Sequence, residues 1–87
     1  MKIDIDQPTR TNNFYRTRDL SEASYIYASG RKLSQLENSN GIAWFIFEDE
    51  GRCKKLADAF WSGKSTINAR EYSNAMRNLK NLIFSRI

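Results

Sequence analysis

The chain has 87 residues, 14 of them basic and 10 acidic, and its formal net charge is +4 at neutral pH. A length of this order suits one domain with a single hydrophobic core, which a hydrophobic content of 40% can fill. Histidine is absent and Cys53 is the single cysteine, which excludes Ser–His–Asp triads, histidine metal sites and an internal disulfide. No apolar run is long enough to span a membrane, so we expect a cytoplasmic protein without membrane contact.

The positive charge is concentrated near the C-terminus. Residues 59–87 contain five basic residues and one acidic residue, whereas residues 19–58 contain five basic and seven acidic residues. Residues 1–18 add four basic and two acidic residues. This asymmetry favours an anionic partner, of which nucleic acid is the commonest, although an ordinary solvated basic surface explains it equally well.

The N-terminal residues predict an arm followed by a strand. Residues 1–12 contain the only proline, Pro8, among polar neighbours, and we expect a flexible arm here. The single domain is then expected over residues 13–87. Residues 13–18 alternate weakly between apolar and polar side chains, which predicts a first strand with Phe14 facing inward.

Helix signals follow this strand directly. Asp19 and Glu22 have the spacing of a capping box, with Thr17 as a competing N-cap. Gly30 is a typical residue for ending a helix in the left-handed conformation. An apolar stripe at helical spacing lies between these signals. Its members are Leu20, Ala23 and Tyr27.

A β-hairpin is predicted next. Residues 31–37 and 42–48 flank Asn40-Gly41, a dipeptide that supplies the positive φ angles of a tight hairpin turn. The second of these strands is apolar on both faces. In a three-stranded sheet such a strand is central and covered on both sides, or it exposes one face to a partner.

Two more helices complete the predicted fold. The first covers residues 50–62, with Asp49 as its N-cap and Gly63 as its stop. The second covers residues 68–87, with Asn68 as its N-cap. The element order is therefore β-α-β-β-α-α, and we expect an α+β fold in which helices cover a small three-stranded, mainly antiparallel sheet.

The C-terminal helix has two different faces. Its apolar stripe consists of Tyr72, Ala75, Met76, Leu79, Ile83 and Ile87. The opposite face carries arginine, which reaches phosphates or guanine edges, and asparagine, which pairs with adenine. We expect nucleic acid to contact Arg70, Asn74, Arg77, Lys80 and Asn81, with Arg16 and Arg18 in support. A solvated helix face without a ligand is the alternative interpretation.

Signals for catalysis are weak. Gly63-Lys64-Ser65-Thr66 resembles the end of a phosphate-binding loop, but Asp58 occupies the position of the required first glycine, and a helix precedes it. Glu48, Asp49 and Glu50 are consecutive acidic residues, for which helix capping is a sufficient explanation. Cys53 falls within an apolar stripe and is expected to be a buried structural thiol. We therefore expect no enzymatic activity, no cofactor and no metal.

Several aromatic side chains lie off the predicted inward stripes, namely Tyr15, Tyr25, Trp44 and Trp61. Such residues can stack on unpaired bases or anchor a protein–protein interface. For the second case we expect an interface that contains Trp44, Ile46 and Trp61. Its partner is either a host protein or a second copy of the chain in a homodimer.

An ordered set of short motifs spans about residues 13–84. It comprises Phe14-Tyr15-Arg16-Thr17-Arg18-Asp19-Leu20, Ala23, Gly30, Leu33, Phe45, Phe47, Phe60-Trp61-Ser62-Gly63, Asn68-Ala69-Arg70 and Leu79-Lys80-Asn81-Leu82-Ile83. This set resembles a small uncharacterised family from phages, prophages and other prokaryotic chromosomes, a domain of unknown function. The resemblance implies the α+β fold and a mobile-element origin, and it carries no established activity.

Two main functional hypotheses follow, and a third, an enzyme or a small-ligand sponge, would require an exposed pocket with convergent arginines. The first is a non-enzymatic nucleic-acid-binding or regulatory module, which the charge asymmetry and the C-terminal helix favour. The second is a protein-interaction module, such as a phage accessory or counter-defence protein that binds a host factor. The doubly apolar strand and the spare tryptophans favour this second hypothesis.

Overall fold

The computed structural model describes residues 13–86, so the predicted arm over residues 1–12 lies outside the described residues. The elements are β2 (Phe14–Thr17), α1 (Leu20–Ala28), β3 (Leu33–Ser39), β4 (Ile42–Glu48), α2 (Glu50–Trp61) and α3 (Ala69–Arg86). This order and the α+β class confirm the sequence prediction. Among the described residues, no helix combines the length and the apolar character needed to cross a membrane.

The sheet has three strands in the order β2-β4-β3, and both pairings are antiparallel. β3 and β4 form the predicted hairpin, in which Asn40 and Gly41 have φ angles of 54° and 80°. Positive φ at both central residues is what a type I′ turn requires, so the Asn-Gly dipeptide defines the hairpin. The doubly apolar strand β4 is central. Phe45 and Phe47 on one side of it belong to the core, whereas Ile42 and Trp44 on its other side are partly exposed.

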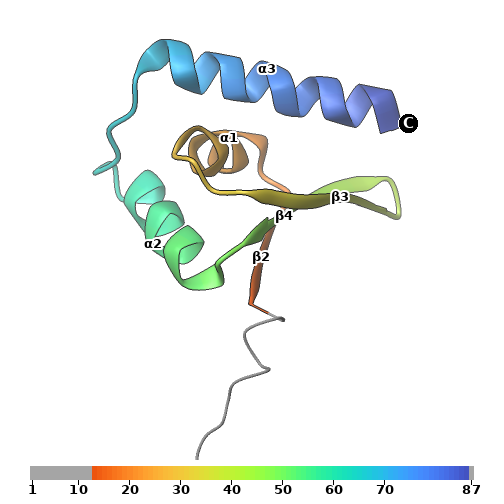
Figure 1. The fold of residues 1–87 in the computed structure, drawn as a ribbon, viewed down its shortest axis with the longest axis horizontal. Helices are drawn as coiled ribbons and strands as arrows, with labels where there is room; N and C mark the ends of the chain where they lie inside the picture. The colour runs from red at the N-terminus through yellow and green to blue at the C-terminus, as the bar shows by residue number, and fades with distance from the viewer. Residues whose placement is uncertain (1–12, 87) are drawn as a thin grey trace, which may run out of the picture.

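The helices and the sheet form layers. Figure 1 shows α1 between the sheet and α3, with α2 beside the end of the sheet where β4 leads into it. The hydrophobic core lies where these elements meet, and each contributes buried side chains. Its buried members are Ala23, Ile26, Phe45, Phe47, Cys53, Ala57 and Leu79.

The side of β2 that faces the core is the opposite of the predicted side. Tyr15 pairs with Phe47 and Thr17 with Phe45, so these two β2 residues share the core-facing side of the sheet. Thr17 is buried, whereas Phe14 is 39% exposed. The prediction that Phe14 faces inward is therefore wrong. Four residues give too short an alternation to determine the inward side.

Helix α1 is buried on more than one side. Residues 22–26 are all buried, including Tyr25, which is only 6% exposed. The prediction that Tyr25 lies off the inward face is wrong because its ring stacks on Phe60 of α2, with 5.7 Å between the ring centres. A helix that is buried on more than one side has no wide polar face.

The predicted helix caps are confirmed. The Asp19 carboxylate accepts from the Glu22 backbone N–H at 2.8 Å, and the Asp49 carboxylate accepts from the Arg52 backbone N–H at 3.3 Å. The Asn68 side chain accepts from two backbone N–H groups of the first turn of α3. These acceptors satisfy donors that have no partner within the helix, and they fix where each helix begins.

Candidate nucleic-acid interface

Helix α3 is held against the fold by its apolar stripe. Leu79 is fully buried and Ala75 is 4% exposed, and Leu82 and Ile83 pack against the core cluster. The Tyr72 hydroxyl donates to the backbone carbonyl of Ser21 in α1 at 3.3 Å. The predicted stripe therefore faces the core, except for Ile87, which lies outside the described residues.

The opposite side of α3 is open. Each residue turns the helix by about 100°, so positions three, four and seven apart project to one side. Exposed residues, Ser73, Asn78 and Ser85 among them, project to the side opposite Leu79 or to its flanks, and six of these residues form the candidate contact surface. We call these six the outer face of α3, and they are Arg70, Asn74, Arg77, Lys80, Asn81 and Phe84. All five α3 residues predicted to contact nucleic acid belong to this set.

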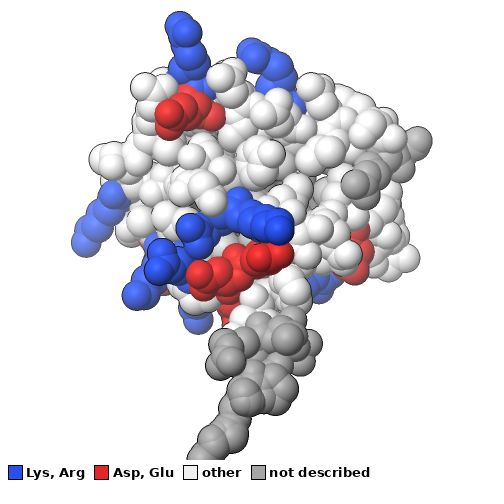
Figure 2. Space-filling model, in the orientation of Figure 1, with Lys and Arg blue, Asp and Glu red and all other residues white. Residues whose placement is uncertain are grey.

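The basic residues of the outer face have no ion-pair partner among the described residues. Within residues 13–86, Arg70, Arg77 and Lys80 form no ion pair. Arg77 donates from Nη1 to the Asn74 side-chain oxygen at 3.2 Å, which orients the guanidinium along the helix surface. Figure 2 shows basic side chains projecting where Figure 1 places α3. An incoming anion therefore meets three cations that form no ion pair, although the exposed Glu71 carboxylate lies next to Arg70 in the first turn of α3.

Phe84 is the residue of the outer face that sequence reasoning missed. It follows Arg77 by seven positions and Lys80 by four, so it shares their side of the helix. Its side chain is 71% exposed, more than that of any other large hydrophobic residue in the described part of the chain. The signal was available in the sequence, because position 84 lies off the stripe through Leu79 and Ile83.

The two supporting arginines are placed elsewhere. Arg16 pairs with Ile46 in the sheet register, on the side of β4 away from the core residues Phe45 and Phe47. Its guanidinium contacts the Glu37 carboxylate at 2.8 Å and lies 4.5 Å from the centre of the Trp44 ring. Arg18 is exposed in the link between β2 and α1. The structure therefore does not bring Arg16 to the outer face.

The three predicted interface residues do not share one surface. Trp44 is partly exposed beneath the Arg16 guanidinium, while Ile46 is only 7% exposed and offers little area to a partner. Trp61 ends α2 and is 62% exposed. Its indole N–H donates to the buried Glu22 carboxylate, which ties α2 to α1.

One protein family matches the chain over residues 12–85. The chain belongs to DUF5659, a domain of unknown function. No curated protein and no solved structure matches this DUF5659 sequence. The match agrees with the uncharacterised family suggested by the ordered motifs, and no activity comes with it.

A buried carboxylate links three elements of the DUF5659 fold. Glu22 in α1 is 6% exposed, and the Tyr15 hydroxyl of β2 donates to it at 2.7 Å, opposite the Trp61 indole. Burial, followed by the hydrogen bond to Glu22, raises the pKa of Tyr15 above its ordinary value. Each carboxylate oxygen thus has a donor, so the arrangement is structural. It also turns the Tyr15 hydroxyl inward, which argues against base stacking by this residue.

Cys53 is buried in the core of the DUF5659 fold, as predicted. Burial raises the pKa of the Cys53 thiol to about 11, although the positive charge of Arg31 partly opposes the increase. The thiol contacts the Glu48 backbone carbonyl at 3.4 Å. A protonated and inaccessible thiol is a poor nucleophile. Across residues 13–86, moreover, no three Cys, Asp or Glu side chains converge on a metal-sized site.

Proposed function

We propose that the chain is a non-enzymatic, cytoplasmic nucleic-acid-binding module of a phage or other mobile element, with the outer face of α3 as its contact surface. One observation carries the proposal. Three cations and two asparagines are exposed along one side of a helix whose other side is anchored in the core. From Arg70 to Asn81 the helix advances by about 16 Å. This is the axial length of about five base pairs.

Phe84 favours unpaired bases over a closed duplex. Its ring is exposed at the C-terminal part of the outer face, next to Lys80 and Asn81. An aromatic ring beside cations is the combination that binds single strands, because the ring stacks on a base while the cations contact the phosphates. We therefore expect single-stranded RNA or DNA, or a loop, to be preferred.

The protein-interaction hypothesis relies on different surfaces. Trp61 on α2 and Phe14 on β2 are exposed aromatic side chains, of the type that anchors protein interfaces. Neither residue belongs to the outer face of α3. Variants of the outer face therefore test the nucleic-acid hypothesis without removing the surfaces that the alternative needs.

Neutralising the outer face is expected to weaken nucleic-acid binding by roughly tenfold to a hundredfold at low salt. The variant carries Arg70→Gln, Arg77→Gln and Lys80→Gln, and these exposed positions tolerate the change because none contributes to the core. Fluorescence anisotropy with a labelled single-stranded oligonucleotide measures the affinity. The slope of log affinity against log salt concentration should also become shallower by about 2, since three phosphate contacts are lost.

A matched variant separates the outer face from net charge. Lys32→Gln, Lys54→Gln and Lys64→Gln remove the same charge from exposed positions outside α3, of which only Lys54 lies on a helix and Lys32 contacts Glu48 at 3.9 Å. We expect this control to bind within about threefold of the parent. Equal weakening by both triple variants would contradict a specific contact by α3. A parent chain that binds neither single nor double strands would refute the proposed function and favour a protein partner.

A further inference from the structure

A second group of cations lines a surface hollow between α1 and α2. The hollow has a volume of about 290 Å³ and is lined by Ser29, Arg31, Arg52, Lys55 and Leu56. Its formation follows from two local structures. The chain reverses after Gly30, whose φ is 95°, and this brings Arg31 back toward the start of α2. On α2, positions 52, 55 and 56 have the spacing that places side chains on one side of a helix.

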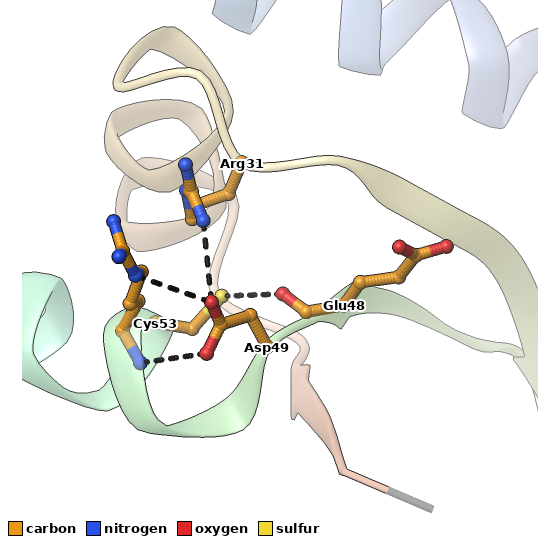
Figure 3. A network of polar contacts seen from close by, with 5 residues as sticks. Arg31, Glu48, Asp49 and Cys53 are labelled. Carbon is orange, nitrogen blue, oxygen red and sulfur yellow. Dashed lines mark hydrogen bonds and ion pairs between the residues drawn. The ribbon is translucent and has the colours of Figure 1, made fainter. Parts of the chain in front are cut away.

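Asp49 holds the two arginines at this hollow. One carboxylate oxygen of Asp49 meets Arg31 Nη1 at 3.4 Å and Arg52 Nε at 3.3 Å, and Figure 3 marks these contacts. Asp49 itself has a left-handed backbone, with φ of 72°, and its backbone N–H donates to the Asn13 carbonyl. The Asp49 carboxylate is therefore held in place, and it orients the side chains of both arginines.

The arginines remain available to a further anion. Charge-assisted N–H···O contacts are strongest at about 2.7–2.9 Å, so the contacts of both arginines to Asp49 are long. Each guanidinium has five N–H donors, and Asp49 engages one side-chain donor of each. Lys55, for its part, forms no ion pair with any residue in the described part of the chain. Most of the donors at the hollow are thus uncommitted.

The net charge of the side chains at the hollow indicates the charge of the ligand that fits there. Arg31, Arg52 and Lys55 contribute three positive charges and Asp49 removes one, which leaves an excess of two. A phosphate monoester carries a charge of about −1.5 to −2 at neutral pH and three acceptor oxygens. A carboxylate offers one charge and two oxygens, and it matches this excess less well.

We propose that this hollow is a binding site for a phosphate monoester, with Arg31, Arg52 and Lys55 as its ligands. Most of the surface that lines the hollow is apolar, and Leu56 contributes to it. The hollow is near the lower limit of ligand pockets, so it accommodates the phosphate and part of the attached group. This site is separate from the outer face of α3 and does not depend on the proposed function.

The direct test is a titration of the ¹⁵N-labelled chain with adenosine 5′-monophosphate, with adenosine as the phosphate-free comparison. We expect the amide signals of residues 29–31 and 52–56 to shift with the nucleotide and not with adenosine. Lys55→Gln is expected to weaken this binding by roughly fivefold, the effect of losing one exposed ion pair. Lys54→Gln is the matched control, because Lys54 is also exposed on α2 but does not line the hollow.

The bound phosphate belongs either to a small phosphorylated molecule or to the end of a nucleic-acid strand. A second titration compares one oligonucleotide with a 5′-phosphate and with a 5′-hydroxyl. Binding of the mononucleotide supports the first source. A preference for the phosphorylated strand that Lys55→Gln abolishes supports the second source.

Three outcomes would overturn the site. They are equal shifts with adenosine, equal loss from Lys54→Gln and Lys55→Gln, and no response to either phosphorylated probe. The neutralised α3 variant should still bind the mononucleotide, so failure of the proposed function remains distinguishable from failure of this site.

Discussion

Phe47→Ala is expected to lower the free energy of unfolding by about 3–5 kcal/mol. The Phe47 side chain is fully buried at the centre of the sheet, where β4 pairs with both neighbouring strands. Truncation removes its apolar contacts and leaves a cavity among Tyr15 and Leu33, its partners across the sheet. A chain of 87 residues has a total stability of about 4–13 kcal/mol. The variant is therefore expected to lose between about a quarter and all of this stability.

Phe84→Ala provides the matched comparison for this prediction. It is the same substitution at a position that is 71% exposed, and we expect a change within about 0.5 kcal/mol. Urea denaturation followed by far-ultraviolet circular dichroism measures both variants. If Phe84→Ala destabilised the chain as much as Phe47→Ala, the placement of Phe84 outside the core would be wrong.

Alkaline pH is expected to destabilise the fold through Cys53. The folded chain keeps the thiol protonated because its pKa rises from the ordinary 9.0 to about 11, whereas the unfolded chain releases the proton near pH 9. The stabilising contribution is thus fully present below pH 9 and is lost as the pH rises through 11. The loss is on the order of 1 kcal/mol at pH 10 and roughly 2–3 kcal/mol above pH 11.

Cys53→Ala isolates this effect. The variant loses some stability at every pH because of the cavity, but its stability relative to the parent should improve between pH 7 and pH 10. The raised pKa of Tyr15 destabilises both proteins in the same direction, and the Cys53 charge is the smallest of its causes, so most of this effect cancels in the comparison. Urea midpoints at the two pH values give the result. Parallel loss of stability in parent and variant would contradict the burial of the thiol.

Local signals predicted most of the fold. Asn40-Gly41, the three capping residues and the helical stripe of α3 each act within a few neighbouring residues, so the sequence alone is sufficient to identify them. Burial on both sides of α1 depends instead on α3, which lies more than forty residues later in the chain. The prediction for Tyr25 is wrong for a similar reason, since its stacking partner Phe60 lies in α2 and no local pattern near Tyr25 shows that contact.

The same distinction between local signals and contacts of distant segments applies to the candidate sites. The basic and asparagine residues of α3 were predictable because one helix presents them all at its own periodicity. The hollow was not predictable, because Arg31 and Arg52 belong to distant segments that meet only through Asp49. The left-handed backbone of Asp49 at the junction of β4 and α2 has no sequence signature beyond the tolerance of aspartate for that conformation.

The central claim is that nucleic acid binds to the outer face of α3. The most direct measurement is a titration of the ¹⁵N-labelled chain with a single-stranded oligonucleotide at low salt, with amide shifts mapped along the sequence. We predict the largest shifts within residues 70–84, with loss of these shifts in the neutralised α3 variant. Shifts confined to the surfaces around Trp61 and Phe14, or no shifts at all, would contradict the account.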